Sequence, residues 1–118
     1  MLVKEALAEA ASRKAVEYLK DRRLRILDRN WRSGSDILPL VAVERHTFVV
    51  VDLRVHAGTR HATPLETISA DRRQLMRRLG ASWMSAHGVR FDQIRIDVVG
   101  LLQDGQGGFT IEHIRAVG

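Results

Sequence analysis

The chain has 118 residues, of which 45% are hydrophobic, and this size suits a single compact domain over residues 1–118. It has no cysteine, which excludes a disulfide framework, a thiolate metal site and a cysteine nucleophile. Lysine and arginine number 19 against 14 aspartates and glutamates, so the formal net charge is +5, and sixteen of the 19 are arginine. Arginine suits bidentate phosphate contacts, but GC-rich coding also favours it, so composition alone leaves both explanations open.

The apolar stretches are too short for a membrane span. The longest apolar stretches without charge, 37–43 and 47–51, fall well below the roughly 20 residues that cross a bilayer. Charge appears at Lys4 and Glu5, too early for the apolar part of a secretion signal. We therefore expect a cytoplasmic protein that does not contact a membrane.

The N-terminal part of the chain predicts a helix followed by two strands. Apolar residues recur at helical spacing over residues 3–19. Alternation over 24–31 and the apolar run 36–43 favour strands, with a Ser-Gly-Ser turn between them. Because Pro39 has no N–H to donate to a sheet, we expect the second strand to lie at an edge or to bulge at this residue.

The middle of the chain predicts a buried strand and a helix. The β-branched run 47–51 is typical of a central strand that is covered on both faces. Residues 56–62 have loop composition, and residues 63–66 form a capping box that favours a helix running to a C-terminal Gly88. Asp71 is compatible with a break and a second start, so one helix and two helices both remain open.

Two further strands close the chain. Residues 93–102 place apolar side chains on alternate positions, and a glycine-rich turn separates them from a last strand over 109–117. These two strands are expected to form a hairpin. The resulting order, α-β-β-β-α-β-β, predicts an α/β fold with a mixed central sheet that is flanked by helices.

Five segments together resemble a known family. The most specific is Ile26-Leu27-Asp28-Arg29-Asn30-Trp31-Arg32, and the others are 17–19, 52–54, 95–100 and 111–118. They resemble the YraN-like family over nearly the whole chain, and the last segment is similar to the close of actinobacterial members. The resemblance implies a restriction-endonuclease-like core related to archaeal Holliday-junction resolvases.

In that core, acidic side chains at neighbouring strand ends hold a divalent metal, and a lysine beside them helps to activate water. This sequence departs from the pattern where the chemistry takes place. Ser12 stands at the acidic position of the first helix, and Ile37 and Pro39 stand where the family has Glu and Asp. Asp52 and Arg54 replace Glu and Lys, and arginine is never deprotonated in proteins, so it cannot act as a base.

We therefore predict a catalytically degenerate nuclease-fold protein that binds duplex or branched DNA without cleaving it. It would not be an enzyme and would need no cofactor. The remnant catalytic positions are Asp36, Asp52 and Arg54. The arginines predicted to bind nucleic acid are Arg22, Arg23, Arg29, Arg32, Arg54, Arg73 and Arg77. All but Arg54 lie in two arginine-rich stretches, 22–32 and 72–78, which line a groove that follows the DNA backbone if both stretches flank the strand ends.

Two alternatives remain. In the first, a bulge near Pro39 brings Asp36 to Asp52, and the pair holds Mg²⁺ or Mn²⁺ in an active endonuclease. In the second, the chain is a protein-interaction module or homodimer that pairs through the Pro39 strand edge. The simplest interpretation of the same residues is a turn for Asp36, an ion pair between Asp52 and Arg54, and a solvated face for the arginines.

Overall fold

The computed structural model describes residues 2–57 and 68–117. In this part of the chain the elements follow the predicted order. Neither of its helices is long and apolar enough to cross a membrane. The elements are α1 (Leu2–Asp21), β1 (Arg25–Ser33), β2 (Asp36–Glu44), β3 (Thr47–Ala57), α2 (Ala70–His87), β4 (Gln93–Gln103) and β5 (Phe109–Ile114).

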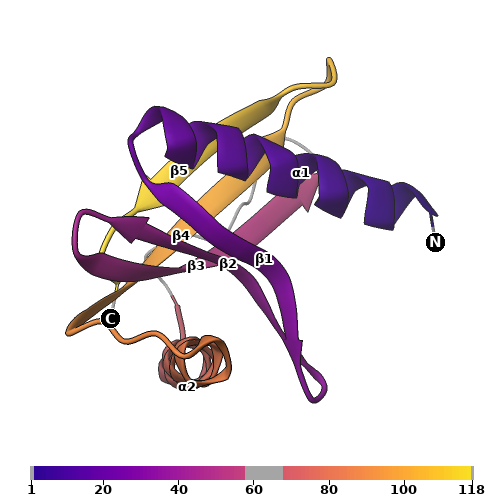
Figure 1. Cartoon of the computed structure of the whole chain (residues 1–118). Coiled ribbons are helices and arrows are strands. Elements are labelled where there is room, and N and C mark those ends of the chain that lie inside the picture. The colour runs from indigo at the N-terminus through magenta and orange to yellow at the C-terminus, as the bar shows by residue number, and fades with distance from the viewer. Residues whose placement is uncertain (1, 58–67, 118) are drawn as a thin grey trace.

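The five strands form one mixed sheet in the spatial order β1-β2-β3-β4-β5. The β3–β4 pair is parallel and the other neighbouring pairs are antiparallel. This follows from the chain order, because α2 lies between β3 and β4 and carries the chain back to the same end of the sheet. The two helices cover opposite faces of the sheet (Figure 1). The predicted α/β fold with a mixed sheet is therefore confirmed.

The strand β3 is buried on both faces, as its β-branched run predicts. Val49 and Val51 face α1 and belong to an apolar cluster that contains Ala11, Ala15 and Leu19 of that helix. Phe48 and Val50 face α2 and belong to a second cluster. The α2 residues of this second cluster are Met76, Leu79, Trp83 and Met84.

β3 is longer than the sequence predicts. It continues past Val51 to Ala57, and every residue from Thr47 onward pairs with β4. The prediction that a loop begins at His56 is therefore wrong, because parallel pairing with β4 and the packing of Leu53 and Val55 in the α1-side cluster keep this segment extended. As a consequence, Asp52 and Arg54 lie inside the strand rather than beyond its end.

β2 is an interior strand, so the prediction of a Pro39 edge strand is wrong. It pairs with β1 on one side and, from Leu40 onward, with β3 on the other. Pro39 lies just outside the β3 pairing, where a missing N–H costs no bond. Leu38 packs in the cluster beneath α2 and Leu40 in the cluster beneath α1, so the strand changes face across Pro39. The register with β1 does not shift at Pro39, and the bulge of this strand pair lies in β1 between Ile26 and Asp28.

The helix α2 begins at Ala70 and is capped at both ends. The Ser69 side chain accepts a hydrogen bond from the Arg72 N–H at 3.0 Å, and residues 68 and 69 are not helical. A single helix that runs on from the capping box to Gly88 is therefore wrong, and the helix start near Asp71 is correct. The capping-box residues 63–66 lie outside the described part of the chain. Gly88 takes the left-handed conformation (φ 66°) at the C-terminus, as predicted.

Gly80 brings α2 close to β3 and predicts a test of this packing. A Cβ at Gly80 would lie 2.7 Å from Val50 Cγ2 and 3.3 Å from Phe48 Cε2. We expect Gly80→Ala to lower the free energy of unfolding by about 1–3 kcal/mol, although alanine favours a helix. Urea unfolding measures the loss. Gly105→Ala, where a Cβ meets open space, should be neutral, and equal stability of the two variants would contradict the packing.

Candidate functional site

Asp52 of β3 forms an ion pair with Arg72 in the first turn of α2. Arg72 Nη2 lies 2.8 Å from Asp52 Oδ1, and Arg72 Nε lies 3.2 Å from Oδ2, so one guanidinium engages both carboxylate oxygens. The Asp52 residue is 2% exposed, whereas the Arg72 side chain is 38% exposed. The Ser69 cap fixes the turn that carries Arg72. The arrangement presents a guanidinium edge to solvent above a buried carboxylate.

The structure also places Asp36 on the α2 side of the sheet. It precedes Leu38 by two residues, and Leu38 packs beneath α2, so the change of face at Pro39 turns Asp36 toward the same side. The pKa of Arg72 is raised above its ordinary value, chiefly by the hydrogen bonds to Asp52 against the opposing effect of burial. The charges of Asp52 and Asp36 contribute further. The charges of Asp36 and Asp52 therefore both act on Arg72.

Arg54, two residues after Asp52 on the same strand face, does not form the ordinary ion pair that the sequence allows. Both oxygens of Asp52 accept from Arg72 instead. Arg72 lies in the arginine-rich stretch 72–78, but the sequence does not identify it as the partner of Asp52. Its position next to the Ser69 helix cap is the one local feature that could have indicated a fixed side chain.

The residues that are present do not fit the divalent metal that the family resemblance implies. Ile37 and Pro39 offer no side-chain oxygen, and the hydroxyl of buried Ser12 accepts from Arg29 Nη1 at 3.1 Å. Asp52 is engaged by Arg72. Over residues 2–57 and 68–117, no three His, Asp or Glu side chains are grouped closely enough to hold a metal ion.

The two predicted arginine stretches lie on opposite faces of the sheet. Next to α1, Arg22 lies over the Tyr18 ring with its Cζ 3.9 Å from the ring centroid, and Arg29 pairs with Glu9 at 3.3 Å. On the other face, Arg73 of α2 donates to the Ile68 carbonyl at 3.0 Å. The structure therefore does not bring both stretches into one groove. Of the remaining predicted residues, Arg23, Arg32 and Arg77 are exposed and Arg54 is half-buried.

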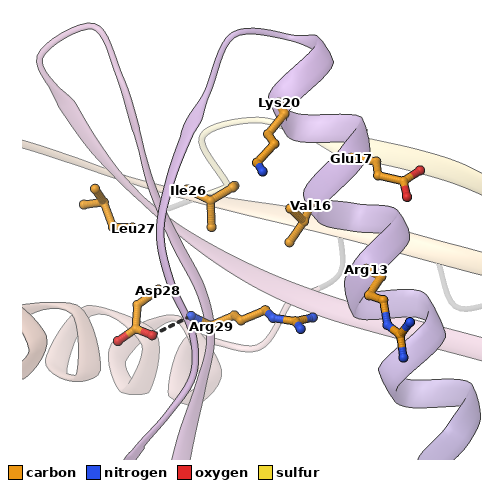
Figure 2. A pocket seen from close by; sticks show the side chains of 8 residues that line it. All are labelled: Arg13, Val16, Glu17, Lys20, Ile26, Leu27, Asp28 and Arg29. Atoms are coloured by element: carbon orange, nitrogen blue, oxygen red, sulfur yellow. Dashed lines mark hydrogen bonds between the residues drawn. The ribbon is translucent and has the colours of Figure 1, made fainter.

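A pocket of about 490 Å³ lies between α1 and β1. Figure 2 shows Lys20 directed into the space between the helix and the strand, with Ile26 and Val16 below it. Its basic side chains Arg13 and Arg29 both pair with Glu9, at 3.2 and 3.3 Å. Because Glu17 and Asp28 also line it, its charges nearly balance, which makes it a poor site for a polyanion.

A second polar cluster, which the sequence analysis missed, lies on the α1 face. Asp97 of β4 is fully buried and accepts hydrogen bonds from Arg95 Nε at 2.9 Å, His113 Nε2 at 2.8 Å and the Ala116 N–H at 2.9 Å. Arg95 also contacts Glu44 of β2 at 2.7 Å, and Arg115 contacts the same carboxylate. The cluster ties β2, β4, β5 and the C-terminal segment together. The sequence feature that could have indicated this cluster is Asp97 itself, which stands between the apolar residues Ile96 and Val98 of a strand.

This cluster predicts a loss of stability in acid. Burial raises the pKa of Asp97, but hydrogen bonds from His113, Arg95 and Ala116 outweigh it, so the pKa lies below its ordinary value. Hydrogen bonds from Arg115 and Arg95 lower the pKa of Glu44. A carboxyl with a lower pKa in the folded state stabilises fully above its unfolded-state pKa and loses this effect as the pH falls through the folded value. We therefore expect the free energy of unfolding to decrease as the pH drops below about 5.

Urea unfolding at a series of pH values measures this dependence. Asp97→Asn, which removes the titrating group, should show a shallower decrease than the wild type. A free energy of unfolding that stays constant down to about pH 3 would contradict the role of these two carboxylates.

The fold and the site define an α/β domain whose retained acidic residue on the central strand is paired with an arginine. The model of the family described as "Uncharacterised protein family UPF0102" matches residues 11–101, and the chain belongs to this family. This confirms the YraN-like resemblance. The chain is 30% identical to a UPF0102 protein of Arthrobacter sp. (strain FB24) and 32% identical to one of Beutenbergia cavernae, each over 118 residues and all of both chains. It is also 32% identical to one of Nocardia farcinica, over 97% of this chain and 90% of the relative.

Proposed function

We propose that this protein binds duplex or branched DNA through exposed arginines and does not cleave it. The observation that carries the proposal is the pairing of Asp52 with Arg72. A nuclease of the related fold would use a carboxylate at this position for its metal, and here a permanent cation of the chain itself engages both oxygens. A guanidinium attracts a phosphate but cannot lower the pKa of a bound water as a divalent metal does.

The neighbouring residues support binding rather than cleavage. Arg54 occupies the position of the family's lysine, and a guanidinium that is never deprotonated cannot accept a proton from water. In the part of the chain that the structure describes, Arg54 makes no ion pair, so its charge is available to a ligand. The formal net charge of +5 acts in the same direction, because it attracts polyanions at long range.

The binding that we propose reads phosphates and not bases. Arginine contacts to the backbone position a protein on DNA without specifying sequence. Trp83 and Phe48, two of the few aromatic residues, are buried in the core, so they offer no stacking platform for single-stranded bases. We therefore expect weak sequence preference and strong dependence on salt.

Fluorescence anisotropy with a short labelled duplex and a four-way junction, at several salt concentrations, tests the proposal. Each phosphate that the protein neutralises contributes about −0.9 to the slope of log affinity against log salt on duplex DNA. We expect Arg54→Ala to reduce the magnitude of this slope by about 1. Lys14→Ala, which removes an equal charge from the opposite helix, should leave it unchanged. Absence of binding at low salt would overturn the proposal.

One observation favours the alternative of an active endonuclease, namely that Asp36 and Asp52 lie on the same side of the sheet and both act on the charge of Arg72. In that case Arg72 would have to leave Asp52 so that Mg²⁺ or Mn²⁺ could bind both carboxylates. Incubation of plasmid and branched DNA with Mn²⁺ separates the two functions. Cleavage that disappears in Asp52→Ala would favour the enzyme, and intact DNA at high protein concentration would favour binding alone.

A further inference from the structure

An open hollow of about 730 Å³ lies at the end of the sheet away from Asp52. It is formed where β2 turns into β3 and where α2 leads into β4, and Thr47 at the start of β3 lines it. Asp52 lies five residues further along the strand, or about 17 Å at 3.3–3.4 Å per residue. The hollow is therefore separate from the candidate site described above.

Three arginines line this hollow: Arg25 at the start of β1, Arg45 in the β2–β3 turn and Arg90 after α2. All three are exposed. Within residues 2–57 and 68–117, none of them makes an ion pair or a hydrogen bond with another side chain. The only carboxylate among the lining residues of this hollow is Asp92. The hollow thus gathers three positive charges against one negative charge, that of Asp92.

Several other arginines on or beside the sheet have a carboxylate partner, although Arg54 does not. Arg95 and Arg115 share Glu44, and Arg29 pairs with Glu9. In these places the fold supplies a carboxylate for each guanidinium. Arg25, Arg45 and Arg90 lack this compensation although they come from three separate segments of the chain. Their mutual repulsion is a cost that a bound anion would remove.

The backbone at Arg45 strengthens the argument. Arg45 and His46 form a two-residue connection between Glu44 and Thr47, and Arg45 has a φ of +58°. A residue with a side chain rarely adopts this left-handed conformation, and glycine or asparagine is favoured in such hairpin turns. The turn itself therefore does not favour arginine, so the backbone gives no reason for this side chain at a position that lines the hollow.

The base of the hollow is held by contacts within the core. Phe91, which lines it, stacks on Phe48 with ring centroids 5.3 Å apart. The Thr47 hydroxyl lies 3.4 Å from Gln93 Oε1 and so links β3 to β4 at this end. These contacts hold the strands and the α2–β4 connection that carry the arginines, so a ligand would meet a largely formed site.

We propose that this hollow binds a phosphate monoester group. Arginine pairs with phosphate oxygens through two parallel N–H···O bonds, and three guanidinium groups match a dianionic monoester better than a monoanionic phosphodiester. The His46 ring can donate a further hydrogen bond to a phosphate oxygen. The group can belong to a free nucleotide or to the phosphorylated end of a nucleic acid strand. The site goes beyond the proposed DNA contacts around Arg54, because it recognises an end or a small molecule.

Titrations followed by NMR or calorimetry test the proposal with four probes: inorganic phosphate, a nucleoside 5′-monophosphate, and one oligonucleotide with and without a 5′-phosphate. We expect inorganic phosphate to bind, with chemical-shift changes at Arg45, Arg90 and their neighbours. Preference for the phosphorylated oligonucleotide over its 5′-hydroxyl form would identify a strand end as the source. Tighter binding of the mononucleotide than of the oligonucleotide would identify a free nucleotide.

Arg45→Gly is the decisive variant because it separates folding from binding. It should unfold at a denaturant concentration equal to or above that of the wild type, since glycine tolerates the positive φ. The same variant should bind phosphate roughly tenfold more weakly, as expected for the loss of a charge-assisted contact. Arg90→Ala should weaken phosphate binding similarly, whereas Lys14→Ala, far from the hollow, should not.

Two results would overturn the proposal. One is the absence of phosphate binding to the wild type at low salt. The other is equal phosphate affinity of the wild type and of Arg45→Gly and Arg90→Ala. Both are independent of the proposed function, because the Arg54→Ala effect on duplex binding can persist when phosphate does not bind in the hollow.

Discussion

Replacement of Asp97 by alanine is expected to lower the free energy of unfolding by about 3–5 kcal/mol. The carboxylate is fully buried and receives Arg95, His113 and the Ala116 N–H within 3.1 Å. Without the carboxylate, the guanidinium of Arg95, whose side chain is only 17% exposed, loses the partner of its Nε and Nη2 atoms. A buried donor left without an acceptor costs far more than the net gain from forming the bond.

Chemical denaturation of the wild type, Asp97→Ala and Asp97→Asn measures this effect. The asparagine keeps the shape and some of the hydrogen bonds but not the charge, so we expect an intermediate loss. Asp92→Ala, which removes an exposed carboxylate, should change the stability by no more than about 0.5 kcal/mol. A loss below about 1 kcal/mol for Asp97→Ala would show that the cluster does not hold β4, β5 and the C-terminal segment together.

The second large effect is expected at the Asp52–Arg72 pair. Arg72→Ala should lower the free energy of unfolding by about 1.5–3 kcal/mol, because a buried carboxylate loses two charge-assisted hydrogen bonds. Arg72→Lys should recover only part of the loss, since a lysine ammonium cannot form the same two parallel bonds.

A double-mutant cycle with Asp52→Ala isolates the interaction between the two side chains. We expect a coupling energy of about 1–3 kcal/mol, in the range that residues in direct contact show. Asp52 and Lys14 do not touch, so a cycle of Asp52→Ala and Lys14→Ala serves as the matched control. Their effects on the free energy of unfolding should be additive. Additivity of Asp52→Ala and Arg72→Ala would contradict the geometry and remove the main support for the proposed function.

Much of the fold follows from local patterns in the sequence. The helical stripe of α1, the β-branched run at the start of β3 and Gly88 at the end of α2 each predict what is observed, because each depends on residues close in the chain. The order of elements and the β4–β5 hairpin follow in the same way. Pro39 predicts neither the position of its strand in the sheet nor the place of the bulge.

The remaining features depend on contacts between distant segments. β3 extends to Ala57 because β4 pairs with it, and the alternation of Leu53 and Val55 with polar residues after Val51 does not identify this partner. Asp52 meets Arg72 through the packing of α2 against β3, which the spacing of 20 residues does not encode. Asp97 meets His113 because β4 and β5 pair in one particular register. The family resemblance identifies Asp52 as a site position but does not supply its partner.

One gel experiment tests most directly whether this protein binds DNA and leaves it intact. A labelled duplex is incubated with excess protein and Mn²⁺ at low salt, and the sample is divided between a native and a denaturing gel. We predict a retarded complex on the native gel and full-length strands on the denaturing gel. Shortened strands that are absent with Asp52→Ala, or a duplex that is neither retarded nor cut, would contradict the account.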